Sequence, residues 1–336
     1  MAMYRVVGVD SSPYTAKVRA VLRYRRLPYQ WICRFPQMWE ETQHVRPALM
    51  PMVQFPGDPD SQYRTDSTLI LYALEAAQPQ HRSITVPHAG LAFISHLIED
   101  MADEWLTKCL FYYRFNTVEA GDFAARWVMD DSKRRQHPES LARDAQIFRA
   151  RQVARMGLVG AIPENGPVIE QTYRRVLATV ETIAGSGSYL FGSRPALADF
   201  GLYAQLRTIG IDPVGMAIMR AHAPRTEHWL RRLDDASGVE GTWHTDIGQL
   251  PSAVGDLLSL AGQMYLPFLK ANTLAVQNKE ESFSAQIGEH PFTTRAFNYQ
   301  AKCYAWLRDE FNAIPNAERE NIRGLLQMSG CLAYFA

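Results

Sequence analysis

The chain has 336 residues, more than the roughly 100–200 of one ordinary domain, so two or three domains are expected. Hydrophobic residues make up 47% and charged residues 21%, and no apolar segment approaches the roughly 20 residues needed to cross a bilayer. The 35 basic and 35 acidic side chains cancel, which argues against nucleic acid or an anionic membrane and favours a small-molecule partner.

The first apolar segment begins within a few residues of Met1 and leaves no room for a secretory signal, so a cytoplasmic location is expected. The four cysteines are far apart in the sequence and show neither zinc-ligand nor disulfide spacing. Reduced and mostly buried thiols are therefore expected at Cys33, Cys109, Cys303 and Cys331.

The first 80 residues predict alternating strands and helices. An apolar run at 4–9 precedes a polar turn at 10–15, and apolar residues at helical spacing then continue until Pro28 stops the helix. The other expected elements are strands at 29–33, 52–55 and 62–64, a short helix at 39–45 and a longer helix at 66–76. The polar stretch 78–83 is expected to be an interdomain linker.

Beyond residue 88 the apolar residues recur every three and four positions, which predicts helices with one buried face. Residues 198–206 are expected to form a buried central helix. The other expected elements are helices at 217–220, 227–233, 254–265 and 297–311, and a β-hairpin at 281–294. Pro267 should kink or end the helix before it. The last hundred residues should be folded and packed, and the sequence assigns them no chemistry.

A turn near the N-terminus indicates a thiol-binding site. The segment 10–15, which has two serines directly before Pro13, joins a strand to a helix. The partial positive charge of a helix N-terminus favours an anion such as a thiolate. Redox proteins of similar organisation carry cysteine at this corner, whereas Ser12 and Thr15 stand there in this chain. A thiol must therefore be supplied from outside.

Three further segments follow in order: 49–53 (LMPMV), 65–72 (TDSTLILY) and 190–200 (LFGSRPALADF). With these motifs the chain resembles the glutathione transferase superfamily. The resemblance implies an α/β thioredoxin-like N-terminal domain at 1–80 and an all-α C-terminal domain at 88–237. Residues 238–336 would then be an additional, mainly helical extension with a small β-hairpin. The family generally forms two-fold dimers, so a homodimer is expected.

The resemblance implies that Ser12 stabilises the glutathione thiolate, with the adjacent Ser11 as the alternative. Both serines are also suited to a turn or a helix N-cap. Some classes of the family use a tyrosine hydroxyl for the same purpose, which makes Tyr14 and Tyr4 further candidates. Tyr14 is weaker because its place inside the turn favours packing, and Tyr4 is weaker still because it precedes the turn by too many residues.

The remaining glutathione contacts are also implied by the resemblance. The Met50 main chain, before a cis-Pro51, would bind the cysteinyl part. Asp66 and Ser67 would bind the γ-glutamyl end at a helix start, where both residues are also favoured as ordinary caps. The candidates for the glycine carboxylate are Gln43, His44 and Arg46, and nothing in the sequence chooses among them.

The helix around residue 100 borders the electrophile pocket in transferases. The residues that would select the second substrate are Tyr14, Asp103, Thr107, Phe111 and Arg114. His96, Asp100 and Asp103 also share one stripe of this helix, where a solvated or cleft-facing polar surface is favoured over a metal or acid/base site. Asp199 is expected to be structural, although Ala196 leaves its helix cap incomplete.

The favoured function is a glutathione transferase with glutathione as co-substrate, no metal, and an apolar or aromatic electrophile bound between the domains. Dehalogenation, ether cleavage and isomerisation use the same thiolate, and the sequence does not separate them. The alternative is a noncatalytic glutathione-transferase-like module that serves in binding or assembly.

Overall fold

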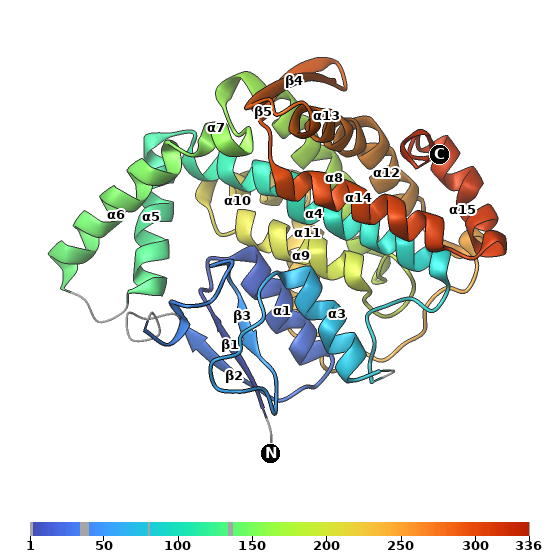
Figure 1. Ribbon diagram of the computed structural model, residues 1–336, viewed down its shortest axis with the longest axis horizontal. Helices are drawn as coiled ribbons and strands as arrows, with labels where there is room; N and C mark the ends of the chain where they lie inside the picture. Colours follow the sequence, from blue (N-terminus) through green and yellow to red (C-terminus); the bar gives the residue numbers. More distant parts are fainter. Residues whose placement is uncertain (1–2, 34–39, 80, 134–136, 336) are drawn as a thin grey trace.

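The computed structural model describes residues 3–33, 40–79, 81–133 and 137–335 (Figure 1). Its N-terminal part is a three-stranded sheet with the strand order β2-β1-β3, in which β1 runs parallel to β2 and antiparallel to β3. The elements are β1 (Tyr4–Gly8), α1 (Pro13–Tyr24), β2 (Tyr29–Cys33), β3 (Met52–Gln54) and α3 (Ser67–Ala77). Helices α1 and α3 lie against each other between the sheet and the helical part of the molecule (Figure 1).

The start of α1 follows directly from local sequence. Ser12 is the N-cap, and Pro13 occupies the first turn, where its missing N–H costs nothing. At Gly8 an added Cβ would lie 2.6 Å from Oγ1 of Thr15, so only glycine allows α1 to pack this closely on β1. The strand, turn and helix predicted at 4–24 are therefore confirmed.

Two predicted elements of this part differ from the structure. The prediction of a strand at 62–64 was wrong, because Arg64 makes only an isolated bridge with Val53. The chain leaves the sheet two residues later at Asp66, whose positive φ of 72° turns it into α3. In the helix predicted at 39–45, Trp39 lies outside the described residues and residues 40–42 are helical. Within the predicted linker, Gln80 lies outside the described residues.

A helical domain follows the linker. Its helices are α4 (Ala89–Phe115), α5 (Val118–Ser132), α6 (Pro138–Val153), α7 (Met156–Val159), α8 (Gly166–Ser186), α9 (Leu197–Ile209), α10 (Pro213–His222) and α11 (Pro224–Asp234). The predicted central helix is confirmed as α9, which is almost wholly buried and packs against α4 and α1. Helices α5 and α6 project together from one side of the molecule (Figure 1).

Asp199 stabilises the start of α9. Its carboxylate accepts hydrogen bonds from the amides of Ala196 (2.8 Å) and Leu190 (3.0 Å). The Leu190 amide gives the carboxylate a second partner outside α9, while Ala196 has no hydroxyl to accept from the first turn. Burial raises the pKa of the Asp199 carboxyl to about 7, although these hydrogen bonds oppose the rise. The structural role expected for this residue agrees with these contacts.

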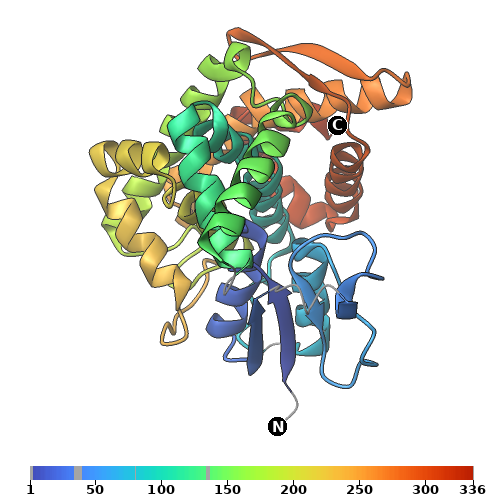
Figure 2. The ribbon, with the colours of Figure 1, turned by 90° about the vertical axis from the view of Figure 1, so that its left-hand side faces the viewer.

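The C-terminal region folds over the helical domain (Figures 1 and 2). Its elements are α12 (Ser252–Leu260), a π-helical turn η3 (Ala261–Tyr265), α13 (Leu266–Gln277), β4 (Ser282–Ile287), β5 (His290–Arg295), α14 (Asn298–Ala313) and α15 (Asn316–Met328). The predicted β-hairpin and the helix at 297–311 are confirmed, whereas α15 was not predicted. Short 3₁₀ turns lie at Pro163–Asn165, Ile247–Gln249 and Leu332–Tyr334.

Pro267 was expected to kink or end the helix before it, and the structure shows a change of helix type at this point. The helical path continues from α12 into α13, with the π-helical turn just before the proline. A π-helical turn shifts the hydrogen-bond pattern by one residue, which gives the ring and its missing N–H a place at the first turn of α13. At Gly262, in the same turn, an added Cβ would lie 2.2 Å from the Ser329 carbonyl oxygen, so this glycine admits the C-terminal segment.

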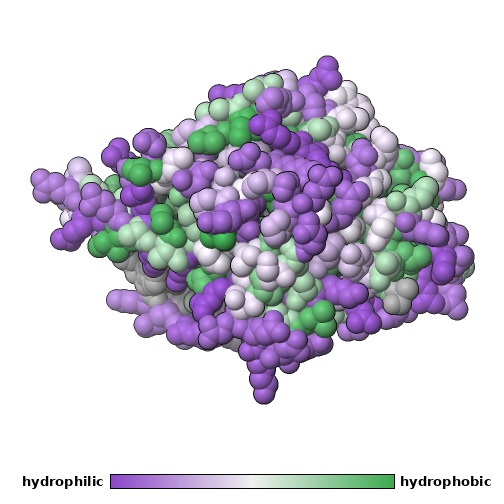
Figure 3. All heavy atoms as spheres, turned by 90° about the horizontal axis from the view of Figure 1, so that it is seen from above, coloured by the Kyte–Doolittle hydropathy of each residue, from purple (hydrophilic) through white to green (hydrophobic). Residues whose placement is uncertain are grey.

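The outer surface of this region is mixed. Hydrophilic side chains predominate on the top face, and hydrophobic ones form small separate groups (Figure 3). Among the helices that the structure describes, none combines the length and hydropathy of a membrane span. All four cysteines are buried and free of disulfide bonds, as predicted.

Candidate functional site

Sheet register brings the three N-terminal motifs to one edge. Val7 of β1 pairs with Met52 of β3, so the turn after β1 lies beside the segment that precedes β3. Val53 bridges Arg64 on its other side, and the chain from Arg64 leads directly to Asp66. The Ser11–Ser12 turn, the Met50–Pro51 segment and the start of α3 therefore converge.

The two serines of the turn differ in their surroundings. Ser12 is half-buried, and its hydroxyl oxygen accepts a 3.3 Å hydrogen bond from the Thr15 amide at the first turn of α1. Ser11 is buried, and its amide donates to Oδ2 of Asp131 on α5, at 2.9 Å. Burial raises the pKa of the Asp131 carboxyl. Ser12 is thus the more accessible hydroxyl, as favoured from the sequence, and its catalytic role stays a prediction.

Asp10, immediately before these serines, fixes the turn to the helical domain. Its carboxylate accepts from Arg19 of α1 (2.7 Å) and from Arg207 of α9 (2.9 Å), and Arg207 also donates to its main-chain oxygen (2.7 Å). Burial raises the pKa of the Asp10 carboxyl, but the two guanidinium groups outweigh this effect and lower it. Neither Asp10 nor Arg207 was predicted as a site residue, since their contact spans 197 residues of the sequence.

The Met50–Pro51 peptide bond is cis, as the resemblance implied, and a second cis bond joins Arg46 to Pro47. Pro51 is buried and Met50 is half-buried. Among the described residues, none hydrogen-bonds to the Met50 main chain. Within the described residues, the Met50 amide and carbonyl thus have no hydrogen-bond partner from the protein.

The start of α3 carries Asp66 and Ser67. Asp66 is the N-cap, with its Oδ1 accepting from the Leu69 amide at 3.4 Å and its Oδ2 accepting from the Tyr299 hydroxyl at 2.7 Å. Ser67 is buried, and its hydroxyl donates to Oδ2 of Asp103 at 3.4 Å. Both residues therefore act as parts of a packed helix start, and the γ-glutamyl contacts predicted for them stay predictions.

Gln43, His44 and Arg46 are all exposed. Arg46 donates to the Gln43 carbonyl (2.6 Å), and the His44 ring contacts the Ser61 carbonyl (2.7 Å). In the described part of the chain, no hydrogen bond or ion pair joins their side chains to the three converging motifs. The structure does not choose among them.

Of the predicted second-substrate residues, Tyr14 lies in the first turn of α1 and the others lie along α4. The Tyr14 hydroxyl donates to the main-chain oxygen of Asp103 at 3.1 Å, and burial raises the Tyr14 pKa although a hydrogen bond with Thr107 opposes the rise. Phe111 lies further along α4 and packs on Phe115, with ring centroids 5.7 Å apart. Tyr14 therefore joins the two domains at Asp103 and Thr107, and Phe111 is apart from this contact.

Two other predictions concern tyrosine and arginine side chains. Tyr4 is buried in the sheet core, where its ring packs edge-on against Phe55 with centroids 5.0 Å apart. Its hydroxyl was the weakest candidate thiolate partner, and this packing agrees with that ranking. Arg114 is buried and forms a 2.7 Å ion pair with Asp212, so its charge is already neutralised.

The polar stripe of α4 is buried, whereas a solvated or cleft-facing surface was expected. Lys17 of α1, itself buried, pairs with Glu99 at 2.6 Å and with Asp103. The C-terminal region covers the rest of the stripe. The contacts are His96 with Glu310, Asp100 with Tyr265 (2.6 Å) and Glu104 with Gln300 (3.1 Å). The expectation failed because the covering residues are more than 150 positions away in the sequence.

Burial raises the carboxyl pKa values along this stripe to about 6 for Asp100, about 7 for Asp103 and about 8 for Glu104. Burial lowers the pKa of His96, but Glu310 outweighs it and raises the value to about 9. Within the described residues, no group of His, Cys, Asp or Glu side chains has the arrangement of a metal site.

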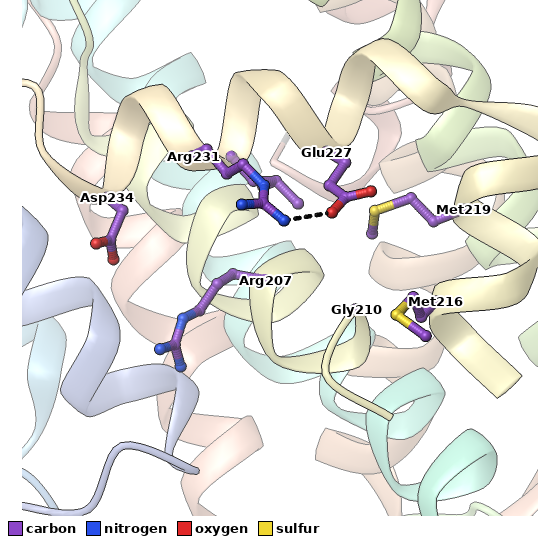
Figure 4. A pocket seen from close by; sticks show the side chains of 8 residues that line it. Arg207, Gly210, Met216, Met219, Glu227, Arg231 and Asp234 are labelled. Carbon is purple, nitrogen blue, oxygen red and sulfur yellow. Dashed lines mark hydrogen bonds and ion pairs between the residues drawn. The ribbon is translucent and has the colours of Figure 1, made fainter. Parts of the chain in front are cut away.

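A cavity of about 410 Å³ lies between α9, α10 and α11 (Figure 4). Its lining mixes apolar and charged side chains: Arg207, Gly210, Met216, Met219, Glu227, Leu230, Arg231 and Asp234. The charged members are paired, as Arg231 is with Glu227 (Figure 4) and Arg207 is with Asp10. None of the residues predicted from the sequence lines this cavity.

A thioredoxin-like domain joined to an all-α domain defines the class of this protein. Residues 6–82 match the family profile "Glutathione S-transferase, N-terminal domain", and residues 139–232 match "Glutathione S-transferase, C-terminal domain". The chain belongs to the glutathione S-transferase superfamily. Both matches end before residue 238, so the C-terminal extension lies outside them.

Solved structures of the superfamily are similar at low identity. A glutathione-S-transferase-like protein from Pseudomonas syringae is 18% identical, with a TM-score of 0.43, covering 69% of this chain and 67% of that one. A glutathione S-transferase from Methylobacterium radiotolerans, in complex with glutathione sulfonate, is 18% identical with a TM-score of 0.43, covering 72% and 97%. The beta-etherase LigF from Sphingobium is 16% identical with a TM-score of 0.43, covering 69% and 95%. No curated protein matches the sequence significantly.

Proposed function

We propose that this protein is a glutathione-dependent transferase. Glutathione would bind along the edge of the sheet, and its thiolate would attack an electrophilic carbon of an apolar or aromatic substrate. A carbon–sulfur bond forms, and the displaced leaving group or the shifted electron pair carries away the negative charge. The observation that carries the proposal is the convergence of the Ser11–Ser12 turn, the Met50–Pro51 segment and the start of α3.

Each end of the tripeptide has a matching group. The Ser12 hydroxyl and the N-terminus of α1 would stabilise the thiolate, because a hydrogen-bond donor and a helix dipole both favour the charged form. The Met50 main chain would bind the cysteinyl backbone. Asp66 would pair with the γ-glutamyl ammonium, while Ser67 and the first amides of α3 would receive its carboxylate.

The second substrate would lie between the domains near Tyr14, Thr107 and Phe111. Asp103 reaches this region through its main chain, because its carboxylate is directed to Lys17 and Ser67. The proposal also includes the division into domains at 1–80 and 88–237 with an extension at 238–336, a cytoplasmic location, a homodimer, and no metal.

A noncatalytic glutathione-binding or assembly module is the second candidate. Two donors at the proposed ligand site are already hydrogen-bonded within the protein, since the Ser11 amide donates to Asp131 and the Ser67 hydroxyl donates to Asp103. A carboxylate beside the thiolate turn also opposes thiol ionisation. Binding without turnover of any electrophile would favour this candidate.

Calorimetric titration of glutathione into the wild type and the Asp66→Ala variant tests the proposal. We expect saturable binding that weakens at least about tenfold in the variant, because the ammonium loses its carboxylate. The matched control is Asp60→Ala, which removes an exposed carboxylate of the same domain. Absence of binding by the folded wild type would overturn the glutathione site, and binding would justify a screen of aromatic electrophiles.

A further inference from the structure

The first turn of α14 lies against the start of α3. The Tyr299 hydroxyl donates to Oδ2 of Asp66 at 2.7 Å, and the other carboxylate oxygen accepts from the Leu69 amide. These two side chains are 233 residues apart. A residue of the C-terminal extension therefore orients the carboxylate that the proposed function assigns to the γ-glutamyl ammonium.

Tyr299 is itself held by a fixed backbone. Asn272 of α13 is fully buried and brackets the Phe297 main chain, donating to its oxygen at 2.9 Å and accepting from its amide at 2.8 Å. On the other side, Gln300 donates to Glu104 of α4 at 3.1 Å. The residues on both sides of Tyr299 are thus anchored, and its hydroxyl contacts Asp66 before any ligand binds. This lowers the conformational entropy that is lost when a ligand binds.

Aromatic rings extend this contact into a partly exposed surface. Tyr299 packs edge-on against Trp306, with ring centroids 6.1 Å apart, and lies 6.4 Å from the Phe297 ring. Phe297 is 53% exposed and Trp306 is 38% exposed. The Tyr299 ring, which carries the hydroxyl bonded to Asp66, is thereby held by aromatic contacts on its own segment.

We propose that Tyr299 is a positioning residue for the γ-glutamyl end of glutathione, acting by holding the Asp66 carboxylate toward the ligand ammonium. The C-terminal extension thereby forms one wall of the glutathione site and favours thiols that carry the γ-glutamyl amino group. This inference rests on the proposed function.

The test compares two probes on three proteins. The probes are glutathione and its desamino analogue, glutaryl-cysteinyl-glycine, which lacks only the ammonium. The proteins are the full-length wild type, Tyr299→Phe and Tyr304→Phe. Tyr304 lies on the same helix, and its hydroxyl donates to the Tyr334 carbonyl at 2.9 Å. The control therefore loses a similar hydrogen bond that does not involve Asp66.

We expect Tyr299→Phe to bind glutathione three- to tenfold more weakly in calorimetry while its affinity for the desamino analogue stays at the wild-type value. Unchanged binding of the analogue also shows that the variant is folded. Tyr304→Phe should bind both probes like the wild type. In the Asp66→Ala background, Tyr299→Phe should weaken glutathione binding no further, because its effect passes through Asp66.

Equal weakening of both probes would overturn the inference, since Tyr299 would then only support the fold. Glutathione affinity that is unchanged in Tyr299→Phe would overturn it as well and would leave the proposed function intact. A wild type that binds neither probe would overturn the proposed function and this inference together.

Discussion

The two ends of the proposed glutathione site are held in place by different parts of the chain. At the thiol end, Asp131 of α5 and Arg207 of α9 contact the serine turn, so the helical domain positions it. At the γ-glutamyl end, Tyr299 of the extension contacts Asp66. The groups that would face the ligand are local in sequence, whereas the groups that orient them come from more than 100 residues away. Chemistry and positioning are thus encoded separately.

The largest effect is expected at the thiol end, where a substitution should lower turnover, whereas a substitution at the γ-glutamyl end should lower affinity. Ser12→Ala should lower turnover about 100-fold and change glutathione affinity less than about twofold, because it removes a donor needed mainly by the thiolate. Steady-state kinetics with a chromogenic aromatic electrophile, together with calorimetry, measure both quantities. Asp66→Ala should show the opposite pattern, with the larger loss in affinity.

Ser11→Ala is the matched control for the thiol end. It should change turnover less than about threefold, because this side chain is buried and the Asp131 contact is made by its amide. A greater loss in Ser11→Ala than in Ser12→Ala would transfer the thiolate contact to Ser11. A loss of stability alone in Ser12→Ala would reduce Ser12 to a helix cap.

The same division explains which features the sequence could predict. The turn at Ser12, the cis-Pro51 and the helix start at Asp66 follow from local residue chemistry and a family resemblance, and all three were located correctly. The buried stripe of α4 was misjudged because polar residues on one helix face look solvated until their partners are known. Lys17, within the apolar run of α1, was the one local sign of a buried acidic partner.

The C-terminal extension shows the same limit. Its hairpin and α14 could be predicted from the spacing of apolar residues and from turn residues. No local pattern predicts the hydrogen bond between Tyr299 and Asp66. The path through Pro267 depends on a π-helical turn, and the close approach at Gly262 depends on a segment more than 60 residues later. Tertiary contacts, not local propensity, decide these features.

A prediction of intermediate size concerns the pH dependence of stability that arises from the buried polar stripe of α4. Carboxyl pKa values of about 7 for Asp103 and about 8 for Glu104 mean that the folded protein keeps protons that the unfolded chain releases near pH 4. Stability from these groups is full below that pH and is lost as pH rises toward 8. The raised pKa of His96, about 9, adds a loss between about pH 6.5 and 9.

Chemical denaturation at pH 5 and pH 8 measures this dependence. Glu104→Gln should reduce the decrease in unfolding free energy between these pH values by about 3 kcal/mol, because the amide is neutral at both and can still contact Gln300. Glu289→Gln, at an exposed position, is the control and should leave the decrease unchanged. An unaltered or larger decrease in Glu104→Gln would mean that Glu104 is charged in the folded protein across this range.

The smallest expected effect returns to the thiol end. Asp131→Asn keeps an acceptor for the Ser11 amide but removes a negative charge beside the turn. The pKa of bound glutathione's thiol should therefore fall by about 0.5 unit, since a nearby anion disfavours the thiolate. Ultraviolet absorbance of the bound thiolate across pH measures the shift, and Asp130→Asn, at the exposed neighbouring position, should not produce it.

Tyr299→Phe should leave this pKa unchanged, because Tyr299 acts at the other end. A rise in Asp131→Asn would show instead that the carboxylate aids ionisation, which would make the helical domain a participant in thiol activation as well as a support for the turn.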